Sequence, residues 1–176
     1  DQEIDKLIVC GSPSKNRAAG LAILITNMIK SIKGDHYRSN FINHLAFGNY
    51  NKHFEEVTSM NAWVCSNEES VKLYDDELCG FVFTTNGFLN LFHLMKDIYL
   101  KKGYQVNHKK LPILFIAGSD DPVIIKEKNW KDAQVFLKNI GYQNVRGILY
   151  PNMRHEILNE LNKEKVYHDI LDFIKE

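Results

Sequence analysis

The sequence LPILFIAGSDDPV at residues 111–123 decides the fold, because it joins an uninterrupted apolar run to a polar turn. Such a run is typical of a buried strand in a parallel sheet covered on both faces, whereas a half-exposed strand alternates apolar and polar residues. Gly118 and Ser119 predict a turn, and two adjacent carboxylates, Asp120 and Asp121, follow it. This stretch therefore predicts a parallel sheet with acidic side chains at the carboxyl end of one strand.

Two further segments predict neighbouring strands. LIVC at residues 7–10 is closed by Gly-Ser-Pro, and VRGILY at residues 145–150 is followed by PNMRH. Between the second and third strands, apolar residues recur at helical spacing over residues 126–139, and Gly141 predicts the end of that helix. A strand, a helix and a second strand in this order are typical of a parallel crossover unit.

Apolar residues at helical spacing predict two more helices, over residues 17–32 and 162–174. We expect the second of these to cover one face of the sheet. The fold class is therefore α/β.

The middle of the chain has a different character. It contains several short helical patches broken by glycines, and no clear strand, so we expect an inserted helical cap. The predicted division is a first core strand and helix at 1–34, the cap at 35–105, and the C-terminal core at 106–176. Aromatic residues of the cap could line a substrate-binding pocket, or they could simply form the core of the insertion. These residues are Phe81, Phe83, Phe88 and Phe92.

Composition excludes several classes of protein. The 22 basic and 22 acidic side chains cancel, so the chain has no net positive field to attract nucleic acid or an anionic membrane surface. Three widely spaced cysteines indicate a reduced protein more than a disulfide scaffold or a zinc site. No apolar run is long enough to span a bilayer, and no signal-peptide pattern precedes the first strand. We expect a cytoplasmic protein, and peripheral contact with a membrane stays open.

Polar side chains that could carry chemistry follow the second and third predicted strands. Asp120 and Asp121 follow one strand, and His155 follows the other. Loops at the carboxyl ends of neighbouring parallel strands converge, so these side chains should meet. A carboxylate that fixes the tautomer of a histidine is the orienting half of a nucleophilic triad.

The same two loops carry a family resemblance. IAGSDDPV at residues 116–123 is similar to the acid-bearing loop of α/β-hydrolases, and YPNMRHEILNE at residues 150–160 resembles the histidine loop of lysophospholipases and monoacylglycerol lipases, in the serine aminopeptidase S33-like superfamily. The resemblance implies that Asp121 is the catalytic acid, with Asp120 as the fallback, and that His155 is the base. It also implies a lipid-like ester substrate, either a lysophospholipid or a monoacylglycerol, and no metal or organic cofactor.

No Gly-x-Ser-x-Gly motif occurs, so the nucleophile elbow of this fold is missing from the sequence. Ser12 and Ser14 lie beside Pro13 and lack the glycine spacing of that turn. We therefore expect the nucleophilic serine and the oxyanion hole upstream, so that the chain is the C-terminal part of the enzyme and is inactive alone. The strand at residues 7–10 would then have an open edge, which predicts association with the missing half or self-association.

Two functions of other classes stay open. One is a non-catalytic binding or interaction protein that keeps the hydrolase-like fold. The other is a phosphatase-like enzyme in which Asp120 and Asp121 bind Mg²⁺ through carboxylate oxygens.

Overall fold

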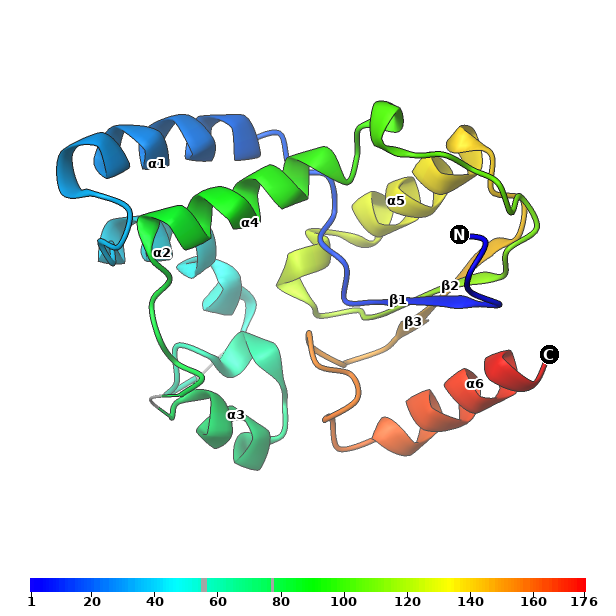
Figure 1. The fold of residues 1–176 in the computed structure, drawn as a ribbon. Coiled ribbons are helices and arrows are strands. Elements are labelled where there is room, and N and C mark those ends of the chain that lie inside the picture. Colours follow the sequence, from blue (N-terminus) through cyan, green and yellow to red (C-terminus); the bar gives the residue numbers. More distant parts are fainter. Residues whose placement is uncertain (55–56, 77) are drawn as a thin grey trace.

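In the computed structural model, which describes residues 1–54, 57–76 and 78–176, three parallel strands form the sheet (Figure 1). The strands are β1 (Leu7–Cys10), β2 (Ile113–Gly118) and β3 (Val145–Tyr150), in the order β1-β2-β3. The α/β fold predicted from the sequence is confirmed. The bounds of β1 and β3 are as predicted, and β2 begins two residues after Leu111.

Two helices cover opposite faces of the sheet. Helix α5 (Glu127–Ile140) connects β2 to β3, and α6 (Lys163–Lys175) follows β3 and lies on the other side (Figure 1). Side chains of β2 alternate between the two faces: Ile113, Phe115 and Ala117 pack in one cluster with Trp130 of α5, and Leu114 and Ile116 pack in another with Phe173 of α6. The continuous apolar run in the sequence therefore reflects burial on both sides of the sheet.

The remaining helices form the cap. They are α1 (Ala19–Lys33), α2 (Asn40–Phe47), α3 (Glu68–Tyr74) and α4 (Thr85–Asp97). Three of these helices have an N-cap side chain that accepts a hydrogen bond from a backbone N–H of the first turn. The N-cap residues are Ser39 before α2, Asn67 before α3 and Thr84 before α4. Short 3₁₀ helices occupy Tyr50–His53, Ala62–Val64, Lys101–Gly103 and Pro122–Ile124.

Helices α1 and α4 lie side by side, away from the sheet (Figure 1). Their contact cluster includes Ile23 and Ile29 of α1 and Phe88 and Phe92 of α4, and Ile42 of α2 joins it. Helix α1, which the predicted division grouped with the first core strand, thus packs with the cap helices. None of the helices in the described ranges is long and apolar enough to cross a membrane.

Candidate active site

Asp121 and His155 meet at the carboxyl ends of β2 and β3. The Nδ1 atom of His155 lies 3.0 Å from Oδ2 of Asp121, within hydrogen-bonding distance. The Asp121 side chain is fully buried, and the His155 side chain is 29% exposed. A buried carboxylate that contacts one ring nitrogen leaves the other, Nε2, as the nitrogen able to exchange a proton with a reacting group.

Local backbone structure fixes the carboxylate of Asp121. Asp121 is the N-cap residue directly before the 3₁₀ helix Pro122–Ile124, and its Oδ1 atom accepts a hydrogen bond from the N–H of Val123 at 2.8 Å. Proline at the first position of a helix needs no N–H partner and has the required φ angle. One oxygen is thus held by the backbone while the other faces His155.

The loop that carries His155, residues 151–160, is called the histidine loop below. It continues the pairing of β2 with β3, because Ser119 donates its N–H to Tyr150 at 2.8 Å and Asp120 donates its N–H to Met153 at 3.0 Å. A Cβ atom at Gly118 would overlap the backbone carbonyl oxygens of Met153 and Arg154. Only glycine permits this close approach of the two loops.

The turn of the histidine loop contains a non-glycine residue in the left-handed backbone conformation. Asn152 adopts a φ of 57°, a left-handed conformation that asparagine tolerates better than most residues. Its N–H donates to Oγ of Ser119 at 2.9 Å, which links the turn to the acid-bearing loop. Asn152 therefore supports the turn both through its backbone conformation and through this hydrogen bond.

The histidine loop is also tied to the cap. The guanidinium of Arg154 donates from Nη1 to the carbonyl oxygens of Ala62 and Cys65, the latter at 3.1 Å. The N–H of Glu156 donates to the carbonyl oxygen of Val64 at 2.8 Å. We call residues 62–66 the anchor segment, because its backbone carbonyl oxygens accept hydrogen bonds from the two residues on either side of His155.

A buried carboxylate completes this attachment. Glu160 is 2% exposed, and its Oε1 atom accepts from the N–H of Arg154 at 2.7 Å and from the N–H of Ser66 at 3.1 Å. The hydroxyl of Ser66 donates to the other oxygen, and the hydroxyl of Tyr74 donates to Glu156. Sequence reasoning assigned no role to these residues, although Arg154, Glu156 and Glu160 lie in the motif YPNMRHEILNE that resembles the histidine loop of the family.

Aromatic rings of the cap lie against His155. The ring centroid of Trp63 is 5.3 Å from that of His155, and the rings are tilted by 42°. The rings of Tyr50 and Trp63 form a T-shaped pair with centroids 4.9 Å apart, and the ring of Phe47 stacks on that of Trp63 with centroids 6.2 Å apart. Desolvation raises the pKa of Tyr50, and the charge of Asp121 raises it further.

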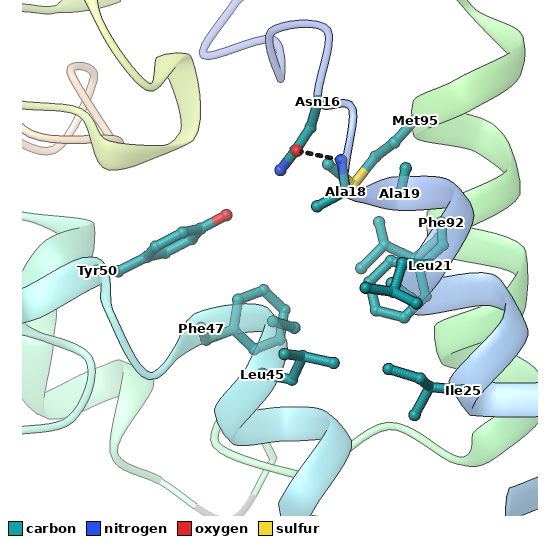
Figure 2. A pocket seen from close by; sticks show the side chains of 13 residues that line it. Asn16, Ala18, Ala19, Leu21, Ile25, Leu45, Phe47, Tyr50, Phe92 and Met95 are labelled. Atoms are coloured by element: carbon teal, nitrogen blue, oxygen red, sulfur yellow. Dashed lines mark hydrogen bonds between the residues drawn. The ribbon is translucent and has the colours of Figure 1, made fainter.

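An apolar pocket opens beside these rings, between α1, α2 and α4 (Figure 2). Phe47 and Tyr50 line one side of it, and Leu21, Ile25 and Phe92 line the other. The contact between Tyr50 and Trp63 connects the pocket to the surroundings of His155.

Of the four cap phenylalanines singled out in the sequence, only Phe92 lines this pocket. Phe88 is fully buried in the cap core, while Phe81 and Phe83 are 53% and 37% exposed. The rings of Phe81, Phe83 and Phe88 contact one another edge to face in series. Phe92 therefore lies at a pocket and Phe88 in the cap core, and substrate binding by the four residues stays a prediction.

The other residues considered as site residues have different surroundings. Asp120 is exposed and accepts a hydrogen bond from Oγ of Ser119 at 2.8 Å. Ser14 is buried, and its hydroxyl donates to the carbonyl oxygen of Ile124 at 2.8 Å. Within the described ranges, no cluster of three metal-ligating side chains forms, and both oxygens of Asp121 already face protein groups.

Cys10, at the end of β1, lies in the field of these acidic groups. Desolvation raises the pKa of its thiol, and the negative charges of Asp121 and Glu156 raise it further. The next residue, Gly11, has a φ of 55°, and a Cβ atom there would be 3.0 Å from Cε1 of His155. The end of β1 therefore borders the histidine ring.

Comparisons with known proteins agree on the fold. A family profile described as serine aminopeptidase, S33, matches residues 2–162. A carboxyl esterase structure from Bacillus coagulans is similar at a TM-score of 0.80 and 21% identity, with coverage of 98% of this chain and 56% of that one. A structure described as a lipase in its open form has a TM-score of 0.77 and 21% sequence identity, with coverage of 98% of this chain and 57% of that one. A monoacylglycerol lipase structure from Paleococcus ferrophilus has a TM-score of 0.61 and 13% sequence identity, with coverage of 97% of this chain and 58% of that one.

The chain thus spans little more than half the length of these proteins, and its fold corresponds to part of theirs. A search of curated protein sequences found no match.

Proposed function

The chain belongs to the serine aminopeptidase S33 family of α/β-hydrolases, and from that premise we propose that it is the C-terminal part of a serine ester hydrolase. The observation that carries the proposal is the hydrogen-bonding distance of 3.0 Å between Asp121 and His155 at two adjacent strand ends. In this proposal His155 is the general base, Asp121 orients it, and the nucleophilic serine lies on a segment upstream of residue 1. Chain order in this fold is serine, then acid, then histidine, which agrees with that arrangement.

In the first half of the reaction, the serine oxygen attacks the ester carbonyl carbon while Nε2 of His155 takes the hydroxyl proton. Asp121 accepts a hydrogen bond from Nδ1–H, and its negative charge stabilises the imidazolium. The C–O bond to the alcohol then breaks, His155 returns the proton to the leaving alcohol, and an acyl-enzyme remains.

In the second half, a water molecule attacks the acyl-enzyme, and His155 takes a proton from the water. The acid leaves as the serine oxygen regains its proton from His155. Backbone N–H donors for the oxyanion come from the residue after the nucleophile and from an earlier loop in this fold, and both would belong to the upstream segment.

We propose lipid-like esters with one acyl chain, monoacylglycerols or lysophospholipids, as the substrates. The apolar pocket supports this class, because its lining is dominated by aliphatic and aromatic side chains. Tyr50 and Trp63 would guide the chain from the carbonyl beside His155 into the pocket. The head group would then stay outside the pocket.

Labelling of the full-length protein with a fluorophosphonate probe tests the proposal. The probe should react with one serine, and His155→Ala should slow the labelling by several orders of magnitude, because the serine loses its base. His168→Ala is the matched control, since His168 is exposed and lies on α6, outside the histidine loop.

Two outcomes would count against the proposal. Labelling at the same rate in His155→Ala would remove His155 from the mechanism. Absence of any labelled serine in the folded full-length protein would favour a hydrolase-like binding protein instead. Ester panels that vary acyl length and head group then define the substrate.

A further inference from the structure

Two polar side chains interrupt the apolar lining of the pocket between α1, α2 and α4. They are Asn16, in the segment before α1, and Tyr50, in the 3₁₀ helix that follows α2 (Figure 2). The other residues that line the pocket are alanines, leucines, an isoleucine, phenylalanines and a methionine. A few polar groups in an otherwise apolar pocket fix the orientation and the chemistry of its ligand.

Both side chains have hydrogen-bonding groups that the pocket lining does not use. Oδ1 of Asn16 accepts a hydrogen bond from the N–H of Ala18 at 2.9 Å, which leaves the amide NH₂ group of Asn16 as a donor. The hydroxyl of Tyr50 points into the pocket and makes no hydrogen bond to another residue of the described lining (Figure 2). Desolvation and the charge of Asp121 raise the pKa of Tyr50, so this hydroxyl keeps its proton and can both donate and accept.

The hydroxyl of Tyr50 lies at the end of the pocket that is connected to His155. The ring of Tyr50 contacts that of Trp63, which in turn contacts that of His155, with centroids 4.9 and 5.3 Å apart. Ile25 and Leu45 line the pocket on the side opposite Asn16 (Figure 2). A chain that enters from His155 therefore meets the two polar groups first and aliphatic side chains after them.

The ligand group that fits these two side chains is neutral. No charged side chain occurs among the described residues that line the pocket, so an ion would lose its hydration there without a counter-charge. A hydroxyl group matches the pair, because its oxygen can accept from the amide of Asn16 while its proton is donated to the oxygen of Tyr50.

We propose that the pocket prefers acyl chains that carry a hydroxyl group on one of the first carbons after the ester carbonyl. A plain alkyl chain would displace water from Asn16 and Tyr50 and return no hydrogen bond to either. A hydroxyacyl chain returns both. This inference rests on the proposed function, because it places the acyl chain of the substrate in this pocket and the ester carbonyl beside His155.

Hydrolysis of matched esters by the full-length protein tests the proposal. The substrates are methyl octanoate, its 2-hydroxy and 3-hydroxy derivatives, and 3-hydroxypropyl octanoate, which carries its hydroxyl on the alcohol instead. At least one hydroxyoctanoate should have a kcat/KM about tenfold above that of methyl octanoate, as expected for one well-placed hydrogen bond. The hydroxypropyl ester should show no such gain.

Tyr50→Phe keeps the ring and removes the hydroxyl. It should lower kcat/KM for the preferred hydroxyoctanoate and raise it for methyl octanoate, because the plain chain no longer displaces water from a hydroxyl. Asn16→Ser keeps an oxygen that can accept from the N–H of Ala18 but removes the amide donor, and it should also reduce the preference. Comparison of variants on the same esters cancels differences in the intrinsic reactivity of the substrates.

Tyr37→Phe is the matched control, since Tyr37 is exposed and does not line the pocket, and it should retain the preference. A preference that persists in Tyr50→Phe, or an equal loss on both esters in that variant, would overturn the inference. So would hydrolysis of all esters without preference, or a gain that follows the hydroxyl of the alcohol. Absence of both ester hydrolysis and fluorophosphonate labelling would instead overturn the proposed function, and this inference with it.

Discussion

The carboxylate of Glu160 binds the residue that directly precedes His155. Its Oε1 atom accepts the N–H of Arg154 at 2.7 Å and the N–H of Ser66 at 3.1 Å, so one buried acid joins the histidine loop to the anchor segment. Because the Glu160 side chain is buried and both N–H groups would lose this acceptor without it, Glu160 should matter both for stability and for the placement of His155.

Glu160→Ala should lower the free energy of unfolding by about 3 kcal/mol, because two N–H groups and a hydroxyl lose their acceptor in a buried setting. Urea denaturation measures this change. Glu3→Ala is the control, since Glu3 is exposed, and should leave the stability within about 0.5 kcal/mol of the starting value. An equal loss in both variants would mean that the Glu160 network contributes nothing specific.

Asp121→Asn should reduce kcat about 10⁴-fold in the full-length protein, because an amide in place of the carboxylate favours the wrong tautomer of His155. Single-turnover ester hydrolysis measures the effect. Asp120→Asn provides the neighbouring control, because its carboxylate is exposed and contacts Ser119. A larger loss in Asp120→Asn than in Asp121→Asn would exchange the roles of the two acids.

Gly118→Ala should destabilise the protein by about 3 kcal/mol, because the new Cβ atom would overlap two backbone carbonyl oxygens of the histidine loop. Gly20→Ala gives the opposite expectation. Gly20 lies in α1 with no atom within 4 Å of the added Cβ, so alanine should stabilise the helix by about 0.5–1 kcal/mol. Thermal denaturation of both variants tests the pair, and the same sign for both would contradict the close approach at Gly118.

Cys10 is exposed, so iodoacetamide can reach it, but its thiol should react slowly near neutral pH. The thiolate is the reactive form, and desolvation with the charges of Asp121 and Glu156 raises the pKa of this thiol, so the pH midpoint of alkylation should lie above that of an ordinary thiol. Asp121→Asn removes one negative charge and should move the midpoint to lower pH. Peptide-resolved mass spectrometry measures the rate. A midpoint that stays fixed in Asp121→Asn would show that the acid does not act on Cys10.

Much of the fold could be predicted because the information is local. Residues 113–118 form an apolar run with no alternation, which only a doubly covered strand explains, and turn residues mark its end. The meeting of Asp121 and His155 could also be predicted, because neighbouring parallel strands bring their carboxyl ends to one edge.

What could not be predicted depends on contacts between distant segments. The period of α1 shows an apolar stripe through Leu21, Leu24 and Met28, yet the helix packs through Ala22, Ile23 and Ile29 and leaves that stripe exposed. Periodicity identifies apolar faces but does not say which one is covered when a helix has two. The Glu160 network escapes sequence reasoning for a related reason, since it joins Arg154 in the same loop to Ser66, which lies 94 residues away in the sequence.

The attachment of the anchor segment to the histidine loop constrains how the proposed hydrolase could open. Movement of residues 62–66 away from the histidine loop would break the hydrogen bonds that they accept from Arg154 and Glu156 and the one that Ser66 donates to Glu160. The residues on both sides of His155 would then lose these contacts. If residues 62–66 moved away, the substrate could enter, but His155 would no longer be aligned to act as the base. Entry of the substrate through the pocket between α1 and α2 avoids this conflict, because the hydrogen bonds that hold His155 stay in place.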